Sequence, residues 1–368
     1  MKATRIISIG IGLLMAATGF AQEKRMAVVE TSTCYMRIAP DYESALETQE
    51  LMGTVVEIVG ESGYWREIVS PQPYKAWTTE KTLVEMSAEQ ISEYEKAPKY
   101  MFTELYGHVY MEPSEKSQTI CDLVGGDVMR VALKVADAKC KNIKLIEHQG
   151  NSSENSEACL EKVRSAITKG KWAQVVLPSG TKGWVLKNAV RPLGERVDIR
   201  IGDISDQLVS DGKMEAIIAS AYQLLGVPYF WGGMSSKGVD CSGLVRISAI
   251  MNDVLLPRNA SQMIKCGTRV KMDYNNAFWD ESNRGTAGFS DKFVEEMHGR
   301  VKELRRGDLV FFGTPATAEK PMRVTHVGIY IGNNRIIHSS HKVRINSLIP
   351  GDADYYENAH RLIAATRL

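Results

Sequence analysis

The chain has 368 residues, of which 44% are hydrophobic and 24% are charged. These proportions are typical of a soluble globular protein and exclude a largely disordered chain, a collagen-like chain and a membrane protein with several spans. Lys and Arg number 45 and Asp and Glu number 44, a formal net charge of +1, so we expect no nucleic-acid partner. At roughly 100–200 residues per domain, this length predicts two or three domains.

Residues 1–21 have the pattern of a secretory signal peptide. Lys2 and Arg5 precede a short apolar stretch, and Gly19 and Ala21 place small residues at the recognition positions of a cleavage site. A buried N-terminal helix is the alternative. No later segment is apolar enough to cross a bilayer, so we expect an exported protein of the bacterial cell envelope, periplasmic or secreted, without stable membrane insertion. The sequence leaves the oligomeric state open.

The six cysteines are too few for a fold built on disulfides. No Cys-x-x-Cys pair occurs, so we expect no structural zinc cluster. Cys140 and Cys159 flank a polar stretch, and in an exported protein they are candidates for a disulfide, a pairing that the sequence leaves open.

The first half of the chain predicts two related all-β domains, at 22–88 and 89–195. In the first, short alternating or apolar runs are separated by Gly and Pro turns. The second repeats its features in the same order and adds an insertion near 137–168. Each copy has two tryptophans twelve residues apart, namely Trp65 and Trp77 in the first and Trp172 and Trp184 in the second.

Residues 196–212 form a predicted linker, and 213–368 change in character. Apolar residues at helical spacing predict one helix over 213–225 and another after Cys241. Alternating apolar residues at 327–331 then predict a strand. Helices followed by strands indicate an α+β domain.

Cys241 lies at the predicted start of its helix, with Asp240 as the candidate N-cap. A helix N-terminus presents free N–H groups and a partial positive charge, and both stabilise a thiolate, the nucleophilic form of cysteine. The same N–H groups can hold the oxyanion of a tetrahedral intermediate. This placement suits a cysteine that attacks a carbonyl.

A nucleophilic cysteine needs a base, and His326 and His338 flank a predicted hairpin. An antiparallel register centred on residue 332 places them opposite each other on one face. We expect His326 to be the base and His338 to orient it. The alternatives are a packing cysteine with structural histidines, and a zinc site that lacks a clear fourth ligand. We expect no metal ion and no organic cofactor.

Five stretches between 226 and 332 resemble, in order, the motifs of the NlpC-type cell-wall peptidases, papain-like cysteine hydrolases of bacteria. They read GVPYFWGG from Gly226, DCSGLV from Asp240, LPRNASQ from Leu256, RGDLVFF from Arg306 and THVGIYIG from Thr325. The resemblance implies Cys241 as nucleophile, His326 as base and His338 as the third polar residue. It also implies that further residues line the substrate site: Tyr229 near the oxyanion, with Trp231, Asp240, Ser242, Arg258 and Ser261. Residues 268–300 exceed the family pattern. We expect a polar surface loop there, and an insertion that reshapes the cleft is the alternative.

The two all-β domains resemble bacterial SH3-like domains, which implies a papain-like catalytic domain preceded by two small barrels. This layout resembles the γ-D-glutamyl-L-diamino-acid endopeptidases of the dipeptidyl-peptidase VI type. The resemblance implies hydrolysis of the bond between γ-D-Glu and meso-diaminopimelate in peptidoglycan stem peptides or muropeptides, with release of L-Ala-D-Glu during cell-wall turnover or recycling.

In that subgroup the first SH3-like domain selects a free N-terminal L-Ala, which implies contacts from Glu47 and Tyr74, although Ala45 lies nearer to the family's acidic position. The alternatives are an N-acetylmuramoyl-L-alanine amidase and a non-catalytic peptidoglycan-binding protein.

Overall fold

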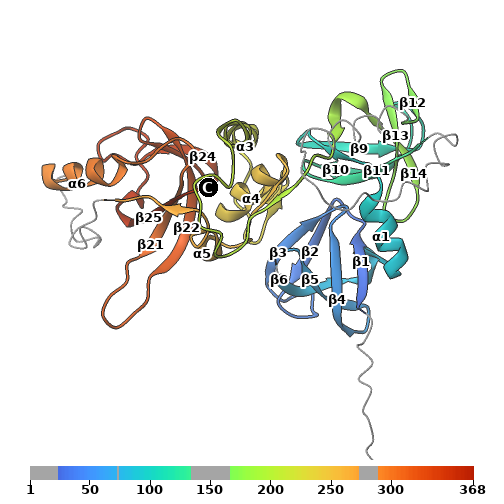
Figure 1. The fold of residues 1–368 in the computed structure, drawn as a ribbon, viewed down its shortest axis with the longest axis horizontal. Coiled ribbons are helices and arrows are strands. Elements are labelled where there is room, and N and C mark those ends of the chain that lie inside the picture. Colours follow the sequence, from blue (N-terminus) through green and yellow to red (C-terminus); the bar gives the residue numbers. More distant parts are fainter. Residues whose placement is uncertain (1–23, 73, 134–165, 273–288) are drawn as a thin grey trace, which may run out of the picture.

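The computed structural model describes residues 24–72, 74–133, 166–272 and 289–368. The predicted signal peptide, Cys140 and Cys159 lie outside these residues. The N-terminal part is all-β, and the C-terminal part mixes helices and strands, as expected. Figure 1 shows two N-terminal sheets, one above the other, at one end of the long axis and the C-terminal part at the other. Among the helices in the described ranges, none is both long and apolar enough to cross a membrane.

The first sheet has seven antiparallel strands. They are β1 (Arg25–Val29), β2 (Thr33–Arg37), β3 (Leu46–Leu51), β4 (Val55–Ser62), β5 (Trp65–Ser70), β6 (Tyr74–Thr79) and β7 (Leu83–Met86), with a short 3-10 helix η1 (Glu80–Thr82) before the last. Their order across the sheet is β3-β2-β6-β5-β4-β1-β7. The connecting helix α1 (Ala88–Lys96) begins at a capping box between Ser87 and Gln90.

The second sheet repeats this topology. Its strands are β8 (Lys99–Phe102), β9 (Tyr106–Tyr110), β10 (Thr119–Val124), β11 (Val128–Val131), β12 (Thr168–Lys169), β13 (Trp172–Val176), β14 (Lys182–Leu186) and β15 (Val190–Pro192), with η3 (Lys187–Ala189) before the last. The order β10-β9-β14-β13-β11-β8-β15 matches that of the first sheet strand for strand, and β12 pairs with β13. Trp65 and Trp172 open the equivalent strands β5 and β13, where both side chains are buried.

The C-terminal part is built on a six-stranded antiparallel sheet in the order β20-β25-β21-β22-β23-β24. These strands are β20 (Thr268–Arg269), β21 (Leu309–Thr314), β22 (Arg323–Gly332), β23 (Arg335–Ser340), β24 (Lys342–Ser347) and β25 (Leu362–Arg367). The remaining elements are β16 (Val197–Asp198), α3 (Asp211–Gln223), β17 (Met234–Ser235), β18 (Gly238–Val239), α4 (Cys241–Ile250), β19 (Val254–Leu255), α5 (Ala260–Met263), α6 (Asp291–Val301) and η6 (Ala359–Arg361).

Both faces of this sheet are covered. Val327, Ile329 and Ile337 face a core shared with α3 and α4. The alternate residues of the same strands face a second core, to which α6 contributes Phe293 and Met297. The expectation of a polar surface loop over 268–300 is therefore wrong for its described C-terminal end. There, apolar residues four apart form one face of a helix that packs on the sheet.

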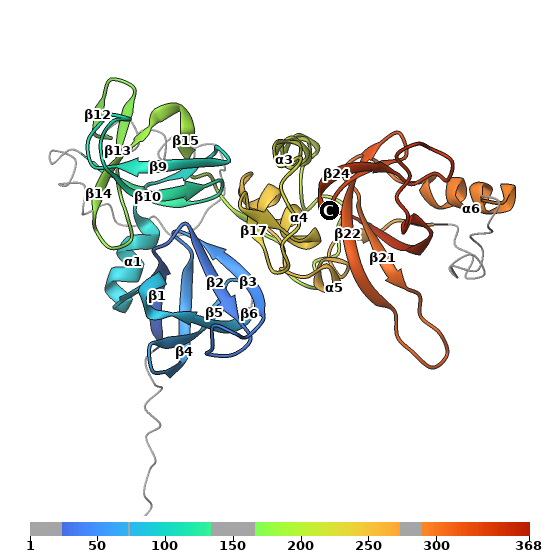
Figure 2. The ribbon, with the colours of Figure 1, turned by 180° about the vertical axis from the view of Figure 1, so that it is seen from behind.

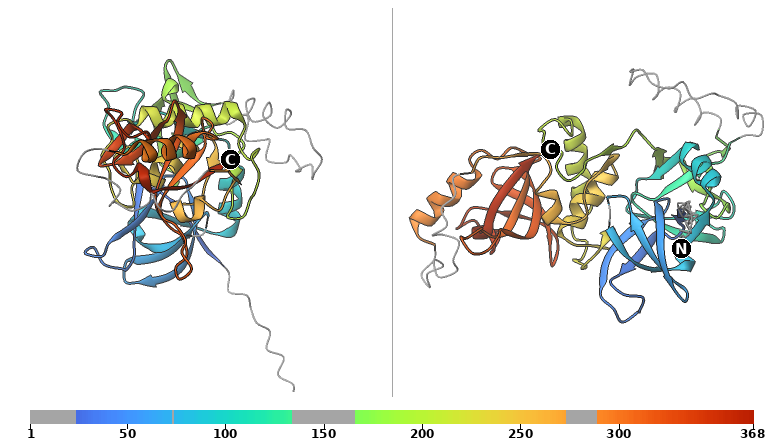
Figure 3. Two further views of the ribbon diagram at one scale, coloured as in Figure 1. Left: turned by 90° about the vertical axis from the view of Figure 1, so that its left-hand side faces the viewer. Right: turned by 60° about the horizontal axis from the view of Figure 1, so that its bottom comes forward.

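The first sheet is joined to the C-terminal part along β3, which Figure 2 shows from behind beside β17. Three consecutive buried side chains of β3 accept hydrogen bonds across the junction: Thr48 from Arg258 at 2.7 Å, Gln49 from the Met234 N–H at 2.8 Å, and Glu50 from Arg246 at 3.3 Å. Leu51 of β3 and Val124 of β10 belong to the same core as α4. All three parts thus share one core, and Figure 3 shows their arrangement in two further views.

Gly243 in the first turn of α4 provides a test of this packing. A Cβ at Gly243 would lie 2.0 Å from the backbone oxygen of Gly233. We expect Gly243→Ala to lower the free energy of unfolding by about 2 kcal/mol, because the helix must shift away from that oxygen. Gly212 in the first turn of α3 has open space around it, so Gly212→Ala changes stability by less than about 1 kcal/mol. Urea unfolding of both variants measures the difference, and equal effects would contradict the packing.

Candidate active site

Cys241 is the first residue of α4, as the sequence predicts. The N-cap residue Asp240 has an extended backbone, and its Oδ1 accepts a hydrogen bond from the Gly243 N–H at 2.7 Å. Helix α4 packs against β22, so the half-buried Cys241 lies beside the strand that carries His326. Its side chain therefore meets both the helix N-terminus and the central sheet.

The thiol of Cys241 has a higher pKa than its position on a helix suggests. Burial, with the negative charge of Asp240 as a smaller cause, raises the pKa of the Cys241 thiol to about 11. The N–H groups of Val327 and Ser242 favour the thiolate and lower this pKa, but less than burial raises it. The expected stabilisation of the thiolate is therefore outweighed, and the side chain is a neutral thiol at neutral pH. A nearby base must take its proton during attack.

The two histidines lie together on one face of the sheet, where His326 Nε2 and His338 Nδ1 are 2.8 Å apart. Their predicted register, however, is wrong by two residues. Strands β22 and β23 pair Ile329 with Ile337, which sets Gly328 rather than His326 opposite His338. The reason is the turn, because Asn333 and Asn334 both have positive φ and form a two-residue loop displaced from the assumed centre.

Hydrogen bonds determine which nitrogen of each ring carries a proton. Asn346 Nδ2 donates to the carbonyl oxygen of Asp354 at 2.7 Å, so Asn346 Oδ1 is an acceptor at 3.0 Å from His338 Nε2. His338 therefore donates from Nε2 and accepts at Nδ1. It follows that His326 donates from Nε2 and keeps a lone pair on Nδ1, which makes Nδ1 the basic atom.

The surroundings keep both rings neutral. Burial lowers the pKa of His338 to about 4. Burial, and then the charges of His338 and Arg344, lower the pKa of His326 well below 6.5. The ring of Tyr356 stands 4.5 Å from that of His338 and 5.7 Å from that of His326, measured between centroids. A neutral His326 is the form that can accept the thiol proton.

Sequence reasoning did not find Asn346. It lies on β24, eight residues after His338, and pairs with Ile336. The signal was a polar residue at a position of the third strand that faces the same side as the histidine. Finding it required the register of two successive hairpins.

Three residues predicted to contact substrate form one buried network under Cys241. Arg258 donates from Nη1 to Asp240 Oδ1 at 3.1 Å and to Ser242 Oγ at 2.9 Å, and from Nη2 to Asp240 Oδ2 at 2.6 Å. Asp240 Oδ2 also accepts from the Gly232 N–H at 3.0 Å. The two carboxylate oxygens of Asp240 are therefore already occupied, and this network holds the start of α4 in place.

Glu47 and Tyr74 of the first sheet are brought together at the junction. The Tyr74 hydroxyl donates to Glu47 Oε1, and both side chains are half-buried. Burial first, and then this hydrogen bond, raise the pKa of Tyr74 to about 12, while a hydrogen bond from Asn259 acts in the opposite direction. A Cβ at Gly232 would lie 3.2 Å from the Glu47 backbone, so the pair is close to the loop before Cys241.

The remaining residues predicted to line the substrate site differ in how far they are buried. Tyr229 is half-buried, and burial, followed by the charges of Cys241 and Asp240, raises the pKa of Tyr229 to about 12. Trp231 is 67% exposed, and Ser261 is exposed on α5. Within the described ranges, no group of three or more His, Cys, Asp and Glu side chains could hold a metal ion.

Residues 226–359 match the model of the NlpC/P60 family. The chain contains an NlpC/P60 domain. This NlpC/P60 domain holds Cys241, His326, His338 and Asn346, whereas Glu47 lies outside it on the first sheet.

The similarity to some known proteins extends beyond the NlpC/P60 domain and includes the N-terminal part of the chain. A γ-D-glutamyl-L-lysine dipeptidyl-peptidase of Bacillus cereus is 26% identical over 330 residues, which cover 86% of this chain and 75% of that protein. Dipeptidyl-peptidase 6 of Lysinibacillus sphaericus is 21% identical over 327 residues, covering 88% of this chain and 91% of its own. A crystal structure of an NlpC/P60 family protein from Bacillus cereus matches with a TM-score of 0.60 and 19% identity, covering 93% of this chain and 99% of the other. The N-terminal sheets are thus part of a shared fold.

Alkylation by iodoacetamide tests the protonation of Cys241. Because only the thiolate reacts and the pKa of Cys241 is about 11, the rate should rise about tenfold per pH unit from pH 6 to pH 9. Peptide mass spectrometry follows the label on Cys241, with Cys241→Ala as the control. The buried Cys34 and Cys266 should remain unlabelled in the folded protein. A rate that is already constant at pH 6–7 would show a thiolate–imidazolium pair instead.

Proposed function

We propose that this protein is a cysteine peptidase that hydrolyses peptidoglycan stem peptides. The observation that carries the proposal is the hydrogen-bond chain from Asp354 through Asn346 and His338, which leaves Nδ1 of His326 as a basic nitrogen. His326 lies on β22, the strand against which the helix of Cys241 packs. The names of the similar proteins, which are dipeptidyl-peptidases, support a peptide substrate. The signal peptide expected at 1–21 is in keeping with action outside the cell.

The bond that we propose is the one between γ-D-Glu and the diamino acid, meso-diaminopimelate. Cys241 Sγ attacks the γ-carbonyl carbon of D-Glu while His326 Nδ1 takes the thiol proton. N–H groups at the start of α4 stabilise the oxyanion. The His326 imidazolium then donates its proton to the leaving amine, and the C–N bond breaks. Water, deprotonated by His326, releases L-Ala-D-Glu and restores the thiol.

Glu47 and Tyr74 support a requirement for a free N-terminal amine. A dipeptidyl-peptidase removes two residues from the amino end of its substrate. Its cleft must therefore be closed two residues away from the nucleophile, by groups that recognise the ammonium group. The backbone of Glu47 lies close to the loop before Cys241, and its carboxylate, hydrogen-bonded to Tyr74, supplies a negative charge in this region. An ammonium on this carboxylate forms a charge-assisted hydrogen bond.

The domain organisation belongs to the same proposal. We propose SH3-like domains at 22–88 and 89–195 and a papain-like catalytic domain at 213–368. The identical strand order of the two N-terminal sheets supports two copies of one small fold. In this arrangement the first copy closes one end of the substrate cleft.

The direct test is mass spectrometry of L-Ala-γ-D-Glu-meso-diaminopimelate after incubation with the purified mature protein. We expect L-Ala-D-Glu and free diaminopimelate, and no product with Cys241→Ala. Muramic-acid-linked peptides distinguish the two alternatives of the sequence analysis. Release of the whole stem peptide from muramic acid would indicate an amidase. Bound but uncleaved peptide in every case would indicate a binding protein.

The role of Glu47 predicts a change in substrate specificity. Glu47→Gln should lower kcat/KM for the free-amine peptide about 10- to 100-fold, because a hydrogen bond to a charged group contributes about 1.5–3 kcal/mol. N-acetylated peptide should be a poor substrate for wild type and should lose little more in the variant. Glu43→Gln, at an exposed position before β3, is the matched control and should behave as wild type. An equal loss on both peptides would contradict recognition of the amine.

A further inference from the structure

The tight hairpin of β17 and β18 leads directly to Cys241. Lys237 lies in its two-residue turn, and the chain then runs through Val239 to the N-cap of α4. The Val239 carbonyl accepts a hydrogen bond from the hydroxyl of Ser339 at 2.9 Å, and Ser339 follows His338 on β23. The end of this hairpin therefore connects the strand of one histidine with the start of the helix of Cys241.

The turn of the hairpin is held by both N-terminal sheets. Lys237 Nζ forms an ion pair with Asp122 on β10 and donates to the hydroxyl of Ser32, before β2, at 3.2 Å. Ser32 in turn donates to Asp122 Oδ1 at 2.9 Å. The neighbouring Ser236 donates from its hydroxyl to the carbonyl oxygen of Leu105, between β8 and β9. Three side chains, one from each part of the chain, therefore meet at this turn.

The ion pair at the turn is charged but only partly buried. Burial would raise the pKa of Asp122, but the hydrogen bonds from Lys237 and Ser32 and the charge of Lys237 outweigh it and lower this pKa. The side chains of Asp122 and Lys237 are 34% and 37% exposed. An ion pair with this much solvent contact adds little to the free energy of folding. We therefore expect its effect on the position of the hairpin rather than on stability.

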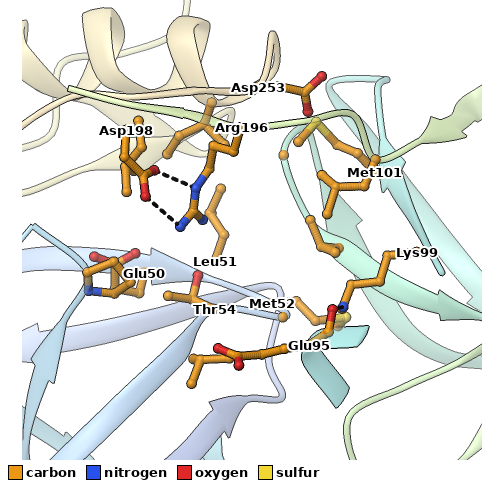
Figure 4. Close-up of a pocket in the computed structure, with 18 of the residues that line it drawn as sticks. Glu50, Leu51, Met52, Thr54, Glu95, Lys99, Met101, Arg196, Asp198 and Asp253 are labelled. Carbon is orange, nitrogen blue, oxygen red and sulfur yellow. Dashed lines mark hydrogen bonds and ion pairs between the residues drawn. The ribbon is translucent and has the colours of Figure 1, made fainter. Parts of the chain in front are cut away.

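Apolar packing places the second sheet against the C-terminal half of α4. A Cβ at Gly126, in the turn before β11, would lie 3.0 Å from the side chain of Ile247. Beside this contact, a cavity of about 480 Å³ is lined by β8, by α4 and by the end of β3. Figure 4 shows Lys99 of β8 and Asp198 of β16 on opposite sides of it. The second sheet thus packs near one end of α4 and reaches the residues before the other end through Lys237.

We propose that Lys237 and Asp122 are positioning residues of the active site, through which the second sheet holds the start of α4 beside the two histidines. The proposal rests on the function proposed above. Asp122 lies outside the residues that match the NlpC/P60 family, so this role belongs to the N-terminal part of the chain. Both residues act through the hairpin rather than on the reacting atoms. The alternative is an ion pair that only adds stability.

Steady-state kinetics with L-Ala-γ-D-Glu-meso-diaminopimelate test the proposal in Asp122→Asn and Lys237→Met. We expect kcat to fall about tenfold and KM to stay within about twofold, because the thiol is misplaced while the substrate contacts are untouched. The double variant should be no slower than either single variant, and Lys237→Arg should keep most of the activity. Glu115→Gln, which breaks an exposed ion pair with Lys171 in the same sheet, is the matched control and should behave as wild type.

Alkylation of Cys241 by iodoacetamide at pH 8 reports the position of the thiol without any substrate. In Asp122→Asn the rate should rise about threefold or more, because a displaced helix start relieves the burial that raises the pKa of the thiol. In Glu115→Gln the rate should equal that of wild type, and the melting temperatures of the two variants should agree.

The two readouts separate this proposal from the proposed function. If wild type cleaves no peptide but Asp122→Asn changes the alkylation rate, the positioning role stands and the peptidase function fails. If wild type cleaves the peptide and Asp122→Asn changes neither kcat nor the alkylation rate, the positioning role is overturned. A kcat that falls only together with the melting temperature would show an ion pair that merely adds stability, and would overturn it as well.

Discussion

The buried guanidinium of Arg258 is the contact on which the rest of the site depends. It holds both oxygens of Asp240, the N-cap of the helix that begins with Cys241, and it donates to Thr48 on the first sheet. One side chain therefore fixes the start of α4 and the position of a strand more than 200 residues earlier in the chain. Removing one member of a buried ion pair costs about 3–5 kcal/mol, so the rest of the site would move with it.

A second constraint is the chain of hydrogen bonds that fixes the tautomers of the two histidines. The carbonyl of Asp354 orients Asn346, Asn346 fixes the tautomer of His338, and His338 fixes that of His326. The groups that form this series of hydrogen bonds are neutral. Burial keeps the two histidines neutral by lowering their pKa values. The raised pKa of Cys241 completes the arrangement, because thiol and imidazole are both uncharged in the free protein. In the proposed mechanism, charge develops only when the carbonyl is attacked, where the N–H groups of α4 can stabilise it.

The sequence predicted the elements that follow local rules. The position of Cys241 at a helix start and of Asp240 as its cap depends on a few neighbouring residues, and both are confirmed. The register of the histidine hairpin failed because it depends on the backbone conformation of Asn333 and Asn334, which apolar periodicity does not report. Asn346 was missed for a related reason, since its place follows from two hairpin registers in succession.

The junction between the first sheet and the C-terminal part is even harder to predict from sequence patterns. Motif resemblance suggested Glu47 with some misalignment, and the structure pairs it with Tyr74 beside the loop that precedes Cys241. Long-range contacts of this kind arise from packing of β3 against the C-terminal part. The spacing of residues within either part carries no signal for them.

The central claim is that the first sheet and the C-terminal part form one substrate site. A crystal structure of Cys241→Ala with bound L-Ala-γ-D-Glu-meso-diaminopimelate tests this most directly. The account predicts the peptide's ammonium group within hydrogen-bond distance of the Glu47 carboxylate and its γ-carbonyl carbon above residue 241, facing His326 Nδ1. A peptide bound with its amino end in solvent, away from the first sheet, would contradict it.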